Sequence, residues 1–164
     1  PRPSSAPRPL PTREPLASGG QPFLNFNGLS AVELLRAFRE HSERFRGPQY
    51  GAWWNSLAKA SGKELVGEQD WQDGLGTART ATLKMVKDLG PTDVARTAWG
   101  LAKLGVRNQP EWRPLWGGLA ERAVETSSKF NEQALANSVW AYATAGHAAP
   151  ALFEAVAAEA ARRG

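Results

Sequence analysis

Cysteine is missing from the 164-residue chain, and histidine occurs only as His41 and His147. A chain without cysteine forms no disulfides and no thiolate metal sites. A zinc site would need both histidines and several carboxylates, at spacings that match no metal-binding motif. No apolar run approaches the roughly 20 residues of a membrane-spanning helix. We therefore expect no metal, no cofactor and no membrane segment.

The residues that are present have the balance of a globular domain, with 41% hydrophobic and 22% charged. The chain is long enough to bury a hydrophobic core. Its formal net charge is +4, and the excess lies in the middle. Residues 77–114 carry seven Lys/Arg against three Asp/Glu, whereas residues 130–164 carry two against three. The central region is therefore where we expect an anionic partner to bind.

The first part of the chain has a different composition. Residues 1–22 hold seven of the twelve prolines, three arginines and one acidic residue. Such a segment has too little apolar surface to offset the entropy of ordering, so we expect it to be disordered. It fits a linker or the remnant of an organelle transit peptide, and the composition favours the linker. The start at Pro1 rather than Met indicates a piece of a longer protein.

Hydrophobic spacing predicts an all-α chain, without the period-two alternation of strands. Ser30 followed by Glu33 is a capping-box pattern that marks the first helix. The predicted helices are 30–45, 49–60, 77–88, 91–104, 111–128, 131–144 and 150–163. We assign residues 23–60 to a degenerate helical hairpin. We assign residues 61–76, which are rich in glycine and acidic residues, to a connector.

Two segments repeat one another at an offset of 41 residues. PTDVARTAWGLAKLG (Pro91–Gly105) aligns with EQALANSVWAYATAG (Glu132–Gly146), which pairs Trp99 with Trp140. Farther along, PLWGGLAERA aligns with ALFEAVAAEA at an offset of 37, because the second hinge is shorter. Each copy therefore has the order helix, glycine turn, proline, helix.

The repeat predicts the architecture of the region 77–164. We expect an α-solenoid of stacked antiparallel hairpins, in which the two clear hairpins are 91–128 and 131–163. Apolar residues cover more than one face of the first helix in each copy, so that helix must be covered on two sides. Alanine favours helix formation at little cost in side-chain entropy. We expect Trp99 and Trp140 to fill equivalent buried positions between layers.

The segment FNEQALANSVWAYATAGH…PALFEAVAAEA resembles the helical-hairpin repeats of the FAST-kinase-like leucine-rich family. Octotricopeptide-repeat proteins and RNA-editing substrate-binding complex proteins have repeats of this style. The core LAN(S/T)xWAxAxxG, here Leu135–Gly146, carries most of the resemblance, and residues 89–130 match more loosely. The resemblance implies RNA binding in mitochondria or plastids. Many members end in a nuclease-like module that these residues do not show, so the resemblance does not imply RNA cleavage by this chain.

Cationic residues share one stripe of the predicted helix 91–104. Arg96, Lys103 and Arg107 lie within about 40° of one another on a helical wheel, provided that the helix extends to Arg107. Cations at such positions hold phosphates. A stripe of this kind is also common on a helix face that only meets water.

Equivalent positions in the second copy carry Asn137 and Thr144. Stacking the copies would align them with the cationic stripe, where an amide such as that of Asn137 can read a base edge. Asn137 could equally serve as a structural hydrogen-bonding residue. We add Lys84 and Lys87 to the candidate RNA site as an extension of the track.

Two functional hypotheses follow. The leading one is a non-catalytic RNA-binding helical-repeat segment of an organellar ribonucleoprotein, mitochondrial or alternatively plastid, acting in RNA processing, stability or translation. Its expected partners are single-stranded RNA and other ribonucleoprotein subunits, with no small-molecule substrate. The alternative is a protein–protein scaffold or structural subunit of a large organellar assembly. No enzyme is predicted, because no nucleophile–base or metal-binding spacing stands out.

Overall fold

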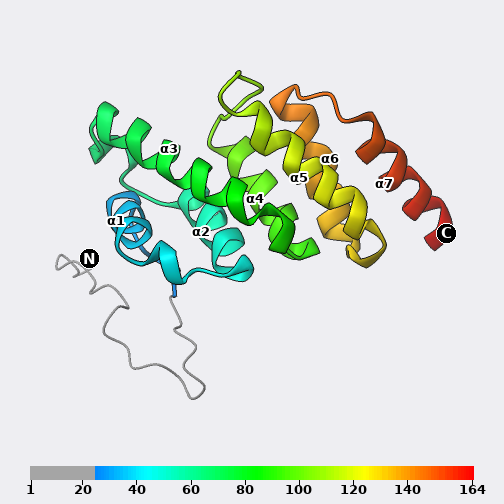
Figure 1. Cartoon of the computed structure of the whole chain (residues 1–164), viewed down its shortest axis with the longest axis horizontal. Helices are drawn as coiled ribbons and strands as arrows, with labels where there is room; N and C mark the ends of the chain where they lie inside the picture. Colours follow the sequence, from blue (N-terminus) through cyan, green and yellow to red (C-terminus); the bar gives the residue numbers. More distant parts are fainter. Residues whose placement is uncertain (1–24) are drawn as a thin grey trace, which may run out of the picture.

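The computed structural model describes residues 25–164, and all regular structure in that range is helical, as expected (Figure 1). The α-helices are α1 Ala31–His41, α2 Gly47–Lys59, α3 Glu68–Met85, α4 Pro91–Lys103, α5 Arg113–Thr126, α6 Glu132–Ala145 and α7 Pro150–Arg163. Short 3-10 turns are η2 Ser42–Arg44, η3 Lys63–Leu65, η4 Val86–Asp88 and η5 Ser127–Lys129. The expected disordered segment 1–22 lies outside the described residues.

The helices form two rows that follow the order of the chain. Helix α4 packs between α2 and α6, and these three form the even row. In the odd row, α1 contacts α3, α3 contacts α5, and α5 contacts α7. Figure 1 shows this succession along the long axis, from α1 at one end to α7 at the other.

Each helix of the even row begins in the same way. A 3-10 turn precedes a buried hydrophobic residue, which is Phe45, Leu89 or Phe130. The next residue is the N-cap, whose backbone is extended so that the chain can turn into the helix. At Gly90 and Asn131 the N-cap angles are the same, with φ −81° and ψ 175°. The 41-residue repeat in the sequence is therefore also a repeat in backbone conformation.

Helices α4 and α6 also end in the same way. Gly105 and Gly146 have φ of +84° and +75°, the left-handed region that glycine adopts without strain. The amide of the next residue, Val106 or His147, donates to the carbonyl oxygen five residues earlier. This is the Schellman arrangement, and it satisfies carbonyl groups that the helix end would leave unpaired.

Close backbone approach joins α2 to α4. A Cβ atom at Gly100 would lie 2.6 Å from the carbonyl oxygen of Trp54, and one at Gly51 would lie 2.9 Å from the Cα atom of Asp93. Only glycine fits at these distances. Helix α6 has Ala141 at the position equivalent to Gly100, and Ala141 is fully buried.

Buried aromatic side chains link the two rows. The Nε1–H of Trp54 on α2 donates to the hydroxyl oxygen of Thr82 on α3 at 3.0 Å. The hydroxyl of Tyr142 on α6 donates to the carbonyl oxygen of Trp116 on α5 at 2.6 Å. Burial also raises the pKa of Tyr142. These bonds satisfy polar atoms that would otherwise be costly in the core, and they fix the register between the rows.

Residues 68–76, which were assigned to the connector 61–76, form the first half of α3 instead. The prediction was wrong because it gave weight to Gly74 and Gly76 as helix breakers. Packing overrides this propensity: Gly74 lies against Leu35 of α1, where a Cβ atom would be 2.8 Å from a methyl carbon. The acidic residues Glu68 and Asp70 lie in the first turn, where their negative charge interacts favourably with the positive end of the helix dipole. The helices from α4 to α7 begin and end within about two residues of their predicted positions.

Candidate nucleic-acid interface

Four of the predicted site residues lie on α4 and α6, the neighbouring helices of the even row. Arg96 and Lys103 are exposed on α4, whereas Asn137 and Thr144 are half-buried on α6. Because α4 packs directly on α6, the structure brings these positions onto adjacent helices.

Arg107 does not continue the helical stripe. Helix α4 ends at Lys103 and the chain turns at Gly105, so the condition for the predicted 40° alignment fails. The Nη1 of Arg107 instead donates to the carbonyl oxygen of Thr144 at 2.8 Å. The guanidinium therefore binds the negative end of α6, which brings Arg107 beside Thr144 but commits one of its donors.

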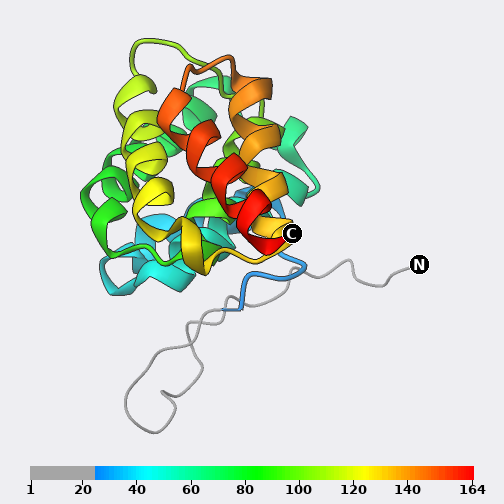
Figure 2. The same ribbon diagram turned by 90° about the vertical axis from the view of Figure 1, so that its right-hand side faces the viewer.

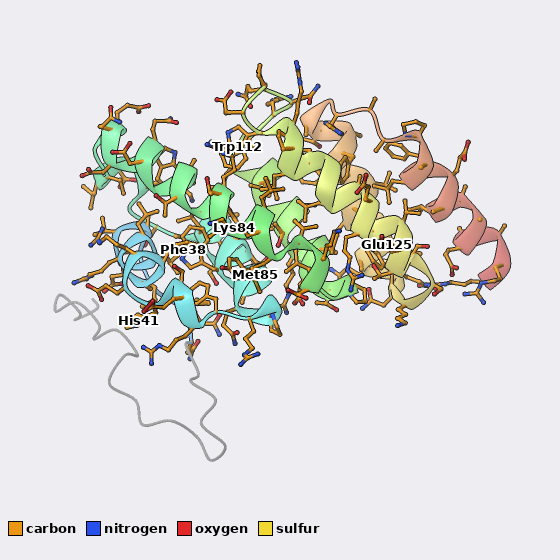
Figure 3. The ribbon with its side chains drawn as sticks, viewed as in Figure 1. Phe38, His41, Lys84, Met85, Trp112 and Glu125 are labelled. Atoms are coloured by element: carbon orange, nitrogen blue, oxygen red, sulfur yellow. The ribbon has the colours of Figure 1, made fainter. Side chains whose placement is uncertain are left out.

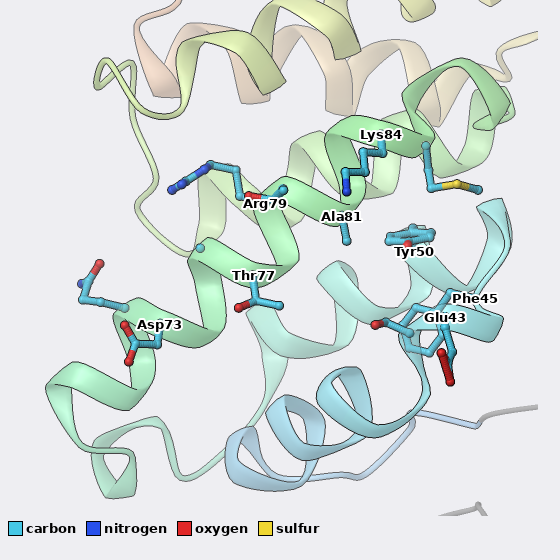
Figure 4. A pocket seen from close by; sticks show the side chains of 13 residues that line it. Glu43, Phe45, Tyr50, Asp73, Thr77, Arg79, Ala81 and Lys84 are labelled. Carbon is cyan, nitrogen blue, oxygen red and sulfur yellow. The ribbon is translucent and has the colours of Figure 1, made fainter.

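Lys84 and Lys87 lie elsewhere: Lys84 is on α3 (Figure 3), and Lys87 is on η4. Lys84 lines an open groove of about 900 Å³ between η2, α2 and α3 (Figure 4). The same groove contains Glu43 and Asp73 as well as Arg79, so its charges are of both signs. These two lysines do not extend the stripe of the even row.

The most distinctive feature of the even row is the indole of Trp99. Its ring has the ammonium of Lys59, from α2, at 5.8 Å and that of Lys103, from α4, at 5.7 Å from the centroid. Both lysines are exposed, and Trp99 is half-buried. We call Lys59, Arg96, Trp99 and Lys103 the α2–α4 cluster. Arg96 belongs to it because residues three apart on a helix are neighbours.

Sequence reasoning missed Lys59. It precedes Lys103 by 44 residues, which is also the separation of η2 from η4. Aligning α2 with α4 at that offset would have placed Lys59 in the same row of side chains. The alignment is hard to see, because α2 has Trp53 and Trp54 where α4 has Thr97 and Ala98.

Trp140 is exposed by 42%, so the prediction that it is buried was wrong. It occupies the position equivalent to Trp99, but α6 packs on the outer side of α4, whereas no described helix packs on the outer side of α6 in the same way. An indole can stack on a base only where its ring is accessible, so exposure is the condition for such a role. The indoles of Trp99 and Trp140 both meet that condition at least in part.

Arg96 also acts on a carboxylate at the start of α4. Burial raises the pKa of Asp93, and this outweighs the opposing effects of the Gly90 amide and the Arg96 charge. The Asp93 carboxylate accepts the Gly90 N–H at 3.0 Å. The Asp93 carboxylate therefore binds the backbone at the N-terminus of α4, and the guanidinium of Arg96 remains at the surface.

A hydrogen bond joins the hinge that follows α4 to the hinge that follows α6. His147 Nδ1 lies 2.9 Å from Asn108 Oδ1, so this nitrogen carries a proton and the amide oxygen accepts it. Partial burial, followed by the nearby charge of Arg113, lowers the pKa of His147. A neutral imidazole with this partner is a structural contact between the two hinges.

Other kinds of site find no support in residues 25–164. No group of three or more His, Asp and Glu side chains there is placed to hold a metal ion. None of the helices in that range is both long and apolar enough to cross a membrane. Comparisons with family models, with curated proteins and with solved structures gave no match.

Proposed function

We propose that this chain is an RNA-binding α-solenoid segment of an organellar protein. It would act in RNA processing, stability or translation in the mitochondrion, or alternatively the plastid, without catalysing a reaction. The α2–α4 cluster carries the proposal, because it sets an accessible indole among three exposed cations. The resemblance of Leu135–Gly146 to organellar RNA-binding repeats favours the same conclusion.

The chemistry of the cluster suits single-stranded RNA. Stacking of a base on an aromatic side chain contributes about 1–3 kcal/mol and tolerates any base. Lysine and arginine beside the ring hold the phosphates. Displacement of Lys59 or Lys103 from the face of Trp99 would free the ring for a base while leaving the ammonium near the backbone. Asn137 on α6 would then contact base edges.

A triple substitution tests this proposal. Lys59, Arg96 and Lys103 are replaced by glutamine, and binding of single-stranded RNA is measured over a range of salt concentrations. We expect weaker binding and a slope of log K against log salt that is flatter by up to about 2, at roughly 0.7 per phosphate. The matched control replaces Lys84, Lys87 and Lys129, which removes the same charge from exposed positions elsewhere. Equal losses in the two variants would contradict the assignment.

A second variant separates stacking from charge. Trp99→Leu keeps an apolar side chain but removes the ring, so we expect weaker affinity with an unchanged salt slope. Asn137→Ala should change sequence preference more than affinity, since base edges carry the sequence information.

The scaffold alternative also rests on an observation, the exposure of Trp140 on α6. Large exposed aromatic side chains are frequent in protein–protein contacts. A protein that binds no RNA at low salt, but copurifies with a stable protein partner in a salt-resistant manner, would support this alternative instead.

A further inference from the structure

The outer face of α6 is exposed where the same face of α4 is covered. On α4, Ala95 and Ala102 are 4% and 6% exposed. Their equivalents at the offset of 41, Ala136 and Ala143, are exposed. Figure 2 looks onto this end of the molecule and shows α6 and α7 there with no described helix in front of them.

Helix α6 covers this face of α4. The α4–α6 contact therefore shows what kind of helix could cover the equivalent face of α6. The first helix of each copy has two buried small residues three positions apart. On α4 these are Thr97 and Gly100, and Gly100 lies against the backbone of α2. On α6 the equivalent residues are Ser138 and Ala141, both fully buried. Small residues at these positions allow the backbones to come close.

We propose that the outer face of α6, together with α7 beside it, is the docking surface for a further helical hairpin. The first helix of that hairpin would present Ser or Thr and Gly or Ala three residues apart, and would pack on α6 as α6 packs on α4. The face defined by Ala136, Ala143 and Trp140 continues the interface already formed inside the chain. This inference does not depend on RNA binding.

A second copy of the chain does not fit as the occupant. In α2, the first helix of the even row, Trp53 stands at the position of Thr97 and Ser138. Trp53 is fully buried, and its Nε1–H donates to the carbonyl oxygen of Leu34 on α1 at 2.8 Å. Helix α1 therefore covers the side of α2 that would have to stack, and the small-residue pairs of α4 and α6 are already buried.

The lengths of the helices in the chain show where an added hairpin should begin after α7. Helices α5 and α7 each have 14 residues, and Ser127 follows directly after the end of α5. A second copy of Ser127–Gly164 placed directly after Arg163 therefore continues the pattern. In that extended chain, the tyrosine equivalent to Tyr142 would donate to the carbonyl oxygen of Phe153, as Tyr142 does to that of Trp116.

The absence of cysteine makes the covering of this face measurable. Ala143→Cys introduces a single thiol on the face, and its rate of reaction with a maleimide is compared in the unextended and the extended chain. We expect the extension to slow the reaction at least tenfold. The control is Thr80→Cys, at an exposed position on α3, whose rate should be the same in both chains.

Circular dichroism and mass measurement complete the test. The expected result is added helical signal in the extended chain, with labelling slowed in the Ala143→Cys variant only. Labelling at the original rate would overturn the proposal, whether the extension is helical or unfolded. Concentration-dependent slowing in the unextended chain, with a dimeric mass, would assign the face to a second copy and overturn the proposed occupant.

Discussion

Helices α4 and α6 share a sequence pattern, N-cap geometry and a glycine-based C-terminus, but they differ in what surrounds them. Helix α4 lies between two helices of its row, whereas α6 has a described neighbour in that row on one side only. As a result, Ala102 is buried and Ala143 is exposed, although both occupy the same place in the repeat. The comparison shows that a repeat position fixes the direction of a side chain, and that the neighbouring element decides its burial.

The largest effect is expected where a charge is placed on this face. Ala102→Glu should reduce the free energy of unfolding by about 3 kcal/mol, because the carboxylate would be buried against α6 without a partner. Ala143→Glu should change it by no more than about 0.5 kcal/mol, because the side chain remains in water. Urea denaturation of the two variants measures the difference. Similar losses would mean that the outer face of α6 is covered in solution.

The two contacts within the even row differ in how closely the helices approach. Gly100→Ala should destabilise the protein by about 2 kcal/mol, because the new Cβ meets the carbonyl oxygen of Trp54 at 2.6 Å and forces α2 and α4 apart. The reverse change on α6, Ala141→Gly, should cost about 1 kcal/mol through helix propensity. Thermal unfolding of both variants tests this order. A stabilised Gly100→Ala protein would contradict the close approach of the α2 and α4 backbones at Gly100.

The paired tryptophans give a smaller difference. The sequence pattern predicted that Trp140 is buried, and replacing a fully buried tryptophan by alanine typically costs about 3–5 kcal/mol. With 42% of its surface exposed, we expect Trp140→Ala to cost only about 1 kcal/mol. Trp99→Ala should cost more, because Trp99 is more buried and loses contact with Lys59 and Lys103. Equal denaturation midpoints for the two variants would contradict the difference in their surroundings.

Local patterns in the sequence were sufficient to predict the all-helical fold, the bounds of α4 to α7 and the pairing of Trp99 with Trp140. They were insufficient wherever a distant segment decides the outcome. Helix α3 begins early because Gly74 packs on α1, and Arg107 leaves the stripe because its guanidinium binds α6. The burial of Trp140 depends on a neighbour of α6 rather than on its own helix. Lys59 joins the candidate site only when α2 is stacked on α4.

The smallest predicted effect concerns the hinges, where Val106 after α4 corresponds to His147 after α6. Val106 is buried and His147 is half-buried. The second copy therefore has a titratable group at the position where the first copy has a buried apolar side chain. Partial burial, and then the charge of Arg113, lower the pKa of His147 in the folded protein. The unfolded chain, with an ordinary histidine pKa near 6.5, therefore binds a proton at a higher pH than the folded chain does.

This difference fixes the sign of the pH dependence. The stability that His147 contributes should be fully present above about pH 7 and should be lost as the pH falls through the folded pKa of His147. Denaturation midpoints of the wild type and His147→Gln, measured from about pH 8 to about pH 5, isolate the effect, which should be small because the imidazole is only half-buried. An NMR titration gives the folded pKa directly, with His41 as the other histidine signal. Arg113→Gln should raise that pKa towards the ordinary value of about 6.5, since it removes the second cause of the shift. A folded pKa at or above that ordinary value in the wild type would mean that the imidazole meets water freely, which would contradict its partial burial.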